Sequence, residues 1–168
     1  IGADISPIKM AAAYATFGNY GTYSKPYTVR KVTTRDGQVT EFKPEQKQAM
    51  KDSTAYMITD VLKDSFKYGF ATQATIPGLP TAAKTGSSNY TVEQKRAMGA
   101  SDYEDIIPDS WFIGYSTDYT ISAWTGYDNP YEQGGGVDTT EQEYSRMIYY
   151  YLMKYMAESS SGDDWVQP

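Results

Sequence analysis

The sequence predicts an α+β fold in which helices pack against an antiparallel sheet. Apolar residues recur at helical spacing in three parts of the chain, and short segments rich in aromatic and β-branched residues lie between them. The expected order is helix, hairpin, helix, three strands, helix. At 168 residues the chain is long enough for one domain with a sizeable core.

Composition narrows the possible functions before any motif is considered. The formal net charge is −6 and no run of Lys or Arg forms a stripe, so no nucleic-acid partner is expected. The chain has no Cys and no His, which excludes thiolate nucleophiles, disulfides, most zinc sites and a Ser-His-Asp triad within these residues. No apolar stretch approaches the ~20 residues that span a bilayer, so no membrane segment is expected in this chain.

The first third of the chain predicts a helix followed by a hairpin. Ser6-Pro7 is typical of a helix start, with Ser as the N-cap and Pro at the first helical position, and Gly18-Asn19 ends that helix. Residues 27–34 and 38–42 flank Asp36-Gly37, which is a strong hairpin signal. Apolar and polar residues alternate poorly in this hairpin, so we expect it to be peripheral.

A second helix and three strands are expected next. The helix begins near Asp52-Ser53 and ends at Gly69, and its apolar residues recur on one face. The third of the three strands follows the second after a short polar connection, which favours antiparallel pairing. We therefore expect three adjacent antiparallel strands, at residues 81–89, 109–116 and 119–127.

The rest of the chain predicts one more helix and two irregular segments. The helix begins near Thr139-Thr140, and we expect it to lie on the sheet through Met147, Ile148, Leu152 and Met156. Residues 89–108 form a long polar connection, the part expected to be least ordered. Residues 158–168 are acidic and rich in Ser, which predicts a flexible acidic tail after a folded segment 1–157.

Lys84-Thr85-Gly86, followed by Ser87, is the strongest candidate site. This tripeptide occurs on the cleft-edge strand of serine acyltransferases that bind β-lactams. Lys84 can attract a substrate carboxylate and favour deprotonation of a neighbouring serine, and the Thr85 or Ser87 hydroxyl can donate to that carboxylate. Gly86 leaves room for an extended peptide along the strand edge, and the Ser87 amide can form half of an oxyanion hole.

The Lys-Thr-Gly tripeptide also occurs by chance in unrelated proteins. The tripeptide alone is expected in roughly 3% of chains of this length, and a turn at a strand end is the simpler explanation. Its position after a helix and before two aromatic strands favours the functional interpretation.

Two other patterns imitate catalytic motifs. Ser6-Pro7-Ile8-Lys9 matches the Ser-x-x-Lys nucleophile pattern, but Ser6 is interpreted as a helix N-cap. Ser87-Ser88-Asn89 matches Ser-x-Asn, yet it overlaps the Lys-Thr-Gly strand and cannot occupy the opposite wall of the same cleft. The acidic residues Asp102, Glu104 and Asp105 could bind calcium, but a solvated loop is the favoured interpretation.

Several blocks of the sequence match one known family in the family's own order: residues 5–17, 54–57, 68–69, 83–90, 109–115 and 123–128. In these blocks the chain resembles the later part of the transpeptidase domain of class A (bifunctional) penicillin-binding proteins. The resemblance runs over nearly the whole chain, and Asn89-Tyr90 is similar to streptococcal members. Ser87 stands where Thr is commoner in the family, so the hydroxyl is kept and a methyl group is lost.

The resemblance implies a partial penicillin-binding, serine β-lactamase-like fold and a serine D,D-transpeptidase that needs no cofactor or metal. Such an enzyme cross-links peptidoglycan stem peptides through an acyl-enzyme and reacts with β-lactams, at the extracellular face of the bacterial cytoplasmic membrane. The resemblance gives Lys84 and Ser87 catalytic roles and gives Lys84, Thr85, Gly86 and Ser87 roles in substrate binding.

The family's nucleophilic Ser-x-x-Lys and its Ser-x-Asn come before the Ser-Pro helix. The nucleophile is therefore expected on the N-terminal remainder of the same domain, without which this chain would be inactive. Two alternatives stay open: a β-lactamase or D,D-carboxypeptidase of the same fold, and a non-catalytic extracellular binding module.

Overall fold

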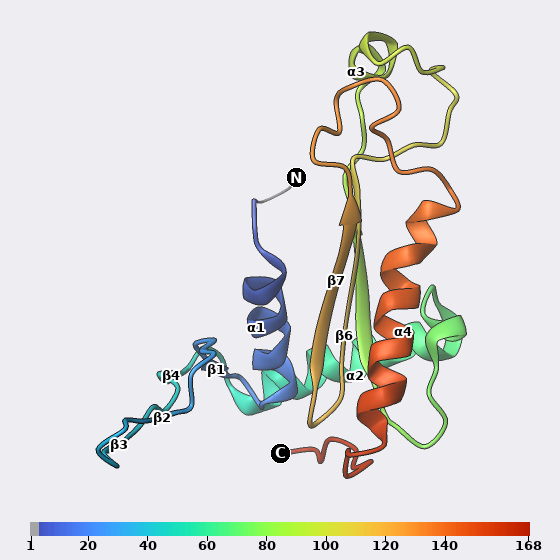
Figure 1. The fold of residues 1–168 in the computed structure, drawn as a ribbon. Helices are drawn as coiled ribbons and strands as arrows, with labels where there is room; N and C mark the ends of the chain where they lie inside the picture. Colours follow the sequence, from blue (N-terminus) through green and yellow to red (C-terminus); the bar gives the residue numbers. More distant parts are fainter. Residues whose placement is uncertain (1–3) are drawn as a thin grey trace.

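The computed structural model describes residues 4–168 and has a three-stranded antiparallel sheet at its centre (Figure 1). The strands are β5 (Ala82–Ser87), β6 (Asp109–Tyr115) and β7 (Thr120–Gly126), and they lie in the order β5-β6-β7. The predicted α+β class and the three adjacent antiparallel strands are confirmed. The first three residues of the predicted segment 1–157 lie outside the described residues.

Helices cover both faces of the sheet. Helix α1 (Pro7–Gly18) packs on β6 and β7 from one side, and α4 (Tyr144–Ala157) packs on the same strands from the other (Figure 1). Helix α2 (Asp52–Tyr68) packs against β5. Two short 3-10 helices, Thr72–Ala74 and Glu141–Glu143, lead into β5 and α4. No helix within residues 4–168 is long and apolar enough to cross a bilayer.

The face of the sheet beneath α4 forms the main core. Phe112 of β6 and Tyr149 of α4 are fully buried, with ring centres 4.7 Å apart, and Met153 packs beside them. Gly114 makes this contact possible, because a Cβ atom at that position would overlap the Tyr149 ring. Close packing of this kind determines which side of the helix faces the sheet.

The side of α4 that packs on the sheet is not the predicted one. Met147, Ile148 and Leu152 are 45%, 42% and 48% exposed, whereas Tyr149 and Met153 are 0% exposed. The helix carries apolar residues around most of its circumference, so the spacing of those residues does not determine which side faces the sheet. The space above Gly114 selects the side that carries Tyr149.

A second core lies between α1, α2 and β6. Tyr115 of β6 is fully buried, and its ring lies 6.3 Å from that of Tyr14. The Tyr115 hydroxyl and Thr59 Oγ1 are hydrogen-bonded at 3.1 Å. Burial raises the pKa of Tyr115 to about 12, so its hydroxyl stays neutral at physiological pH.

The predicted peripheral hairpin is confirmed. Strands β2 (Lys31–Thr33) and β3 (Val39–Glu41) pair antiparallel, every residue in them is exposed, and the hairpin projects from the body of the molecule (Figure 1). At its base β1 (Thr22–Ser24) pairs with β4 (Gln46–Gln48). This second pair was not predicted, because short polar segments of three residues carry no alternation of apolar and polar side chains.

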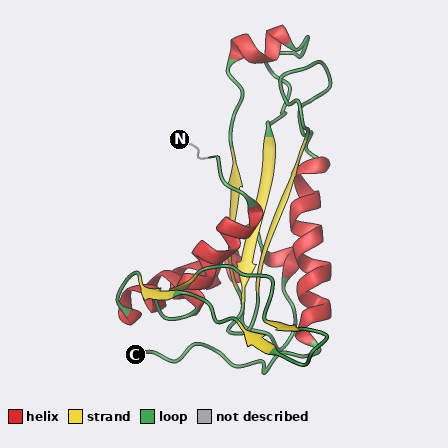
Figure 2. Cartoon of the chain, turned by 60° about the vertical axis from the view of Figure 1, so that its left-hand side comes forward, coloured by secondary structure: helices red, strands yellow, loops and turns green. Residues whose placement is uncertain are grey.

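Residues 89–108 are more regular than predicted. They contain α3 (Val92–Ala97), whose N-terminus has a capping box formed by Thr91 and Gln94, and they have a small core of their own made by Tyr90, Met98 and Ile106. Figure 2 shows this helix at the far end of the sheet from the C-terminus. The capping box was readable from the sequence, since Thr91-x-x-Gln94 is its usual pattern.

The C-terminal segment 158–168 packs against the body of the molecule, unlike the flexible tail that its composition predicts. Trp165 is 6% exposed, its indole nitrogen donates to the Gly18 carbonyl oxygen at 2.9 Å, and its ring centre lies 5.5 Å from that of Tyr115. Asp164 and Lys63 of α2 form an ion pair of 2.6 Å. The average composition of the segment is polar and predicts flexibility, but a single buried indole is enough to anchor the segment.

The packing of Trp165 predicts a stability effect. Trp165→Ala should lower the free energy of unfolding of the protein by about 3 kcal/mol, because it removes a buried indole and its hydrogen bond. Denaturant unfolding measures this loss. Val166→Ala is the matched control, since the neighbouring side chain is 74% exposed. Equal stability of the two variants would mean that the segment is the flexible tail that its composition predicts.

Candidate functional site

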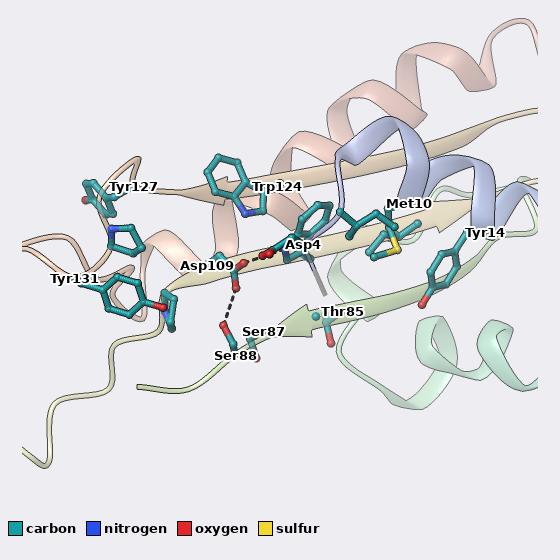
Figure 3. A pocket seen from close by; sticks show the side chains of 16 residues that line it. Asp4, Met10, Tyr14, Thr85, Ser87, Ser88, Asp109, Trp124, Tyr127 and Tyr131 are labelled. Carbon is teal, nitrogen blue, oxygen red and sulfur yellow. Dashed lines mark hydrogen bonds between the residues drawn. The ribbon is translucent and has the colours of Figure 1, made fainter. Parts of the chain in front are cut away.

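An open groove lies on the α1 side of the sheet, at the end where β5 leaves the sheet and β6 enters it (Figure 3). Its volume is about 620 Å³. Met10 and Tyr14 of α1 form one side of it. The end of β5 and the aromatic side chains of β6, β7 and the following loop form the rest, among them Thr85, Gly86, Ser87, Trp111, Trp124 and Tyr127.

The candidate residues Lys84, Thr85, Gly86 and Ser87 occupy the last four positions of β5. Their backbones pair with β6 from Ile113 to Ser110. Among the described residues β5 has no second neighbour, so its other edge is open. An open strand edge offers unpaired backbone donors and acceptors to an extended peptide.

The groove is lined by Thr85, Gly86 and Ser87, whereas the Lys84 side chain is not part of its lining. The Lys84 ammonium donates to the Thr85 carbonyl oxygen at 3.1 Å and lies 5.4 Å from the centre of the Phe70 ring. Lys84 pairs with Ile113, and paired residues of an antiparallel ladder share a face of the sheet. Its Cβ atom therefore lies on the face of Ile113, which lines the groove.

Gly86 determines how closely β5 approaches its neighbour's side chain. A Cβ atom at Gly86 would lie 3.3 Å from the Trp111 Cβ atom, which is tighter than ordinary van der Waals contact. The Trp111 ring in turn meets Trp124 of β7 edge to face, with ring centres 6.5 Å apart. The absent side chain at Gly86 thus leaves room for the indole of Trp111 beside the strand.

Just beyond Ser87 the two strands are linked by side chains. Ser88 Oγ donates to one carboxylate oxygen of Asp109 at 3.2 Å, and the Trp111 indole nitrogen donates to the other at 3.2 Å (Figure 3). The sequence analysis did not identify the contact between Ser88 and Asp109. The available signal was the position of Asp109 directly before the aromatic strand, which is weak by itself.

Two loops meet beyond the end of the groove. The Tyr90 hydroxyl donates to the Pro130 carbonyl oxygen, and the Tyr90 ring meets Tyr131 edge to face at 6.0 Å. These contacts join residues 89–108 to the loop after β7. Burial raises the pKa of Tyr90, so its hydroxyl remains a neutral donor.

The imitation motifs do not form a catalytic arrangement within residues 4–168. Ser6 is the N-cap of α1 and Pro7 its first residue, as the sequence predicted. Ser6 and Lys9 are both exposed, and the Lys9 amide donates to the Ser6 carbonyl oxygen. The hydroxyl of Ser88 is bound to Asp109.

Two of the three candidate calcium ligands, Asp102 and Glu104, make local contacts with their carboxylates. Asp102 forms a two-bond ion pair with Arg96, and Glu104 accepts a hydrogen bond from the Ser101 amide. No group of three or more potential metal ligands occurs in the part of the chain that the structure describes.

Comparison with known proteins gives one consistent family. Residues 1–154 match the penicillin binding protein transpeptidase domain. The chain is 41% identical over 163 residues to penicillin-binding protein 1A of Streptococcus pneumoniae, covering 95% of this chain and 22% of that protein. It is 38% identical over 159 residues to penicillin-binding protein 1A/1B of Bacillus subtilis, covering 94% of this chain and 17% of that protein. It thus spans less than a quarter of these relatives.

Solved structures agree with the fold. The D,D-transpeptidase domain of a peptidoglycan glycosyltransferase from Eggerthella lenta has a TM-score of 0.60 and 25% identity, over 88% of this chain and 32% of that one. The PonA1 protein from Mycobacterium tuberculosis, in complex with penicillin V, has a TM-score of 0.69 and 22% identity, over 96% of this chain and 40% of that one.

The resemblance to class A penicillin-binding proteins is confirmed by the streptococcal and Bacillus relatives, which cover nearly the whole chain. The order of elements and the Lys-Thr-Gly strand beside an open groove agree with that match. The chain therefore belongs to the penicillin binding protein transpeptidase domain family.

Proposed function

We propose that this chain supplies the Lys-Thr-Gly wall of a serine D,D-transpeptidase site. The enzyme would cross-link peptidoglycan stem peptides through an acyl-enzyme and would be acylated by β-lactams. One observation carries the proposal: in a chain of this family, residues Lys84–Ser87 lie on an open strand edge at the rim of a groove of about 620 Å³. The relative solved with penicillin V supports it.

The proposed roles of the four residues follow from their positions. Lys84 would turn its ammonium from the Phe70 ring toward the groove, which requires only side-chain rotation because its Cβ atom already shares the face of Ile113. There it would bind the carboxylate of the stem peptide or the β-lactam. The Thr85 and Ser87 hydroxyls would donate to the same carboxylate. The Ser87 amide would stabilise the developing oxyanion.

The nucleophile and its base would come from the N-terminal remainder of the domain. Ser6 and Lys9 are the only described match to the Ser-x-x-Lys pattern that precedes β5, and they lie exposed at the start of α1. The chain covers 32% and 40% of the two solved transpeptidase chains above, which leaves most of such a domain to other residues.

A second surface of the chain also favours an interface with the N-terminal remainder of the domain. A hollow of about 570 Å³ lies between α4 and β7 and is lined almost entirely by apolar side chains, including Met147, Ile148 and Leu152. β7 is an edge strand among the described residues, and Thr125 Oγ1 on it is buried without a hydrogen-bond partner. We propose that the N-terminal remainder covers this surface. Apolar patches of this kind mark interfaces.

The enzyme would act at the extracellular face of the bacterial cytoplasmic membrane, where peptidoglycan is assembled. Changes in the groove would alter β-lactam resistance.

A β-lactamase or D,D-carboxypeptidase differs from a transpeptidase in the acyl acceptor, which is water. Incubating the acyl-enzyme formed from a stem peptide with an amine acceptor separates these classes, because only a transpeptidase forms the new amide in preference to the hydrolysed peptide. A binding module would not be acylated at all.

The location of the nucleophile predicts the behaviour of this chain alone. Intact-mass spectrometry with excess penicillin should find no covalent adduct on residues 1–168, whereas the complete domain should gain one penicillin mass. An adduct on Ser6 would contradict the assignment of the nucleophile to the N-terminal remainder.

Lys84 should act on acylation and not on folding. In the complete domain Lys84→Ala removes a charge-assisted hydrogen bond worth ~1.5–3 kcal/mol, so acylation should slow at least about tenfold. Lys84→Arg should recover only part of the rate, because a forked guanidinium does not reproduce a compact ammonium. Stopped-flow acylation and a thermal melt measure the two effects.

Lys154→Ala is the matched control for Lys84→Ala. Its ammonium lies 5.7 Å from the centre of the Tyr150 ring, so this variant loses the same kind of contact away from the groove. If Lys84→Ala acylates like the control, the functional role of Lys84 is wrong; if it unfolds, the residue is structural.

The apolar surface of α4 gives a separate test of the N-terminal partner. Leu152→Asp in the complete domain should lower the free energy of unfolding by more than about 2 kcal/mol, because it would bury an unpaired charge. Val39→Asp in the hairpin is the matched control, since Val39 is 52% and Leu152 48% exposed in this chain. Denaturant unfolding that gives equal losses would show that the surface stays open to water.

A further inference from the structure

The ladder between β5 and β6 ends at the residue that the proposed site depends on. Its last pair joins Ser87 to Ser110, so the ladder stops directly at the amide assigned to the oxyanion hole. The next residues, Ser88 and Asp109, continue the pairing through side chains, with Ser88 Oγ donating to Asp109 Oδ1 at 3.2 Å. Strand ends without such a link fray, because no neighbouring bond holds the last pair.

The second carboxylate oxygen of Asp109 holds the side chain that lies against Gly86. The Trp111 indole nitrogen donates to Asp109 Oδ2 at 3.2 Å, and the Trp111 Cβ atom is the nearest atom to the Cβ position at Gly86. One carboxylate therefore fixes both the end of β5 and the indole beside it (Figure 3). No ion pair involves Asp109 among residues 4–168, so its partners are neutral donors.

We infer that Asp109 is a positioning residue for the Lys-Thr-Gly-Ser strand. Its carboxylate does not contact a reacting atom in this role. Through Ser88 it holds Ser87 at the end of β5, and through the indole nitrogen it holds Trp111 in place beside Gly86. The inference rests on the proposed function, because it assumes that the end of β5 binds the acyl group. An error of about 1 Å in such a position costs roughly a hundredfold in rate.

Three substitutions in the complete transpeptidase domain test the inference through the second-order rate constant for acylation by a fluorescent penicillin. Asp109→Ala removes both hydrogen bonds and should lower this constant about ten- to a hundredfold. Asp109→Asn keeps the shape and can donate to Ser88 Oγ while accepting from Trp111, so it should stay within about threefold of wild type. Ser88→Ala removes one bond and should give an intermediate loss.

Asp118→Ala is the matched control. Asp118 lies in the turn between β6 and β7, away from the groove, and its Oδ2 accepts from the Ser160 and Ser161 hydroxyls at 2.6 Å and 3.1 Å. The control therefore removes the same chemistry and should acylate like wild type. Wild-type acylation by Asp109→Ala overturns the inference. Equal damage in Asp109→Asn and Asp109→Ala also overturns it, because that result would require the charge and not the hydrogen bonds.

Amide hydrogen exchange separates this inference from the proposed function. In Asp109→Ala and Ser88→Ala the amides of residues 86–88 should exchange about tenfold faster than in wild type, and in Asp118→Ala they should not. Unchanged exchange in both overturns the inference, and Ser88→Ala decides alone if Asp109→Ala does not fold. A wild-type domain that penicillin does not acylate would refute the proposed function, while exchange would still decide whether Asp109 positions the strand.

Discussion

Six residues of β5 pair with six of β6, and this ladder fixes both faces of the sheet. With Gly86 opposite Trp111, the indole lies beside the candidate strand on the groove face. With Phe112 and Gly114 on the opposite face, Tyr149 of α4 packs into the main core. A register slip of one residue would exchange the two faces, so that the glycines would no longer lie under the rings. The groove and the core therefore depend on the same pairing.

Under the proposed function, this chain supplies one wall of the site and another segment supplies the nucleophile. The groove has its wall of candidate residues but no nucleophile among the described residues that line it, and β7 ends the sheet with an open edge. The exposed apolar side of α4 adjoins that edge. The open edge of β7 and the apolar side of α4 adjoin each other, so a single partner would cover both. Lys84, whose ammonium lies over Phe70, has no anionic group to bind within the described residues.

Much of this fold could be predicted from local sequence. The Ser-Pro helix start, the Asp36-Gly37 hairpin and the three strands each depend on residues close together in the chain, and each was found where it was expected. The position of Lys84, Thr85, Gly86 and Ser87 on a strand followed from the same local patterns. Their chemical roles came from the family resemblance and stay predictions. The α3 helix was missed although its capping box was present, because the polar composition of its segment favoured an irregular loop.

The sequence by itself determined the order of the main helices and strands, the candidate strand and the family, since these depend on near neighbours and on motifs of a few residues. Only the tertiary structure decided which side of α4 is buried, what Asp109 holds and where Trp165 lies. Each of these depends on residues far apart in the chain: Tyr149 with Gly114, Ser88 with Asp109, and Trp165 with Gly18. Residue spacing carries no information on such pairs, because they form only when distant elements pack together.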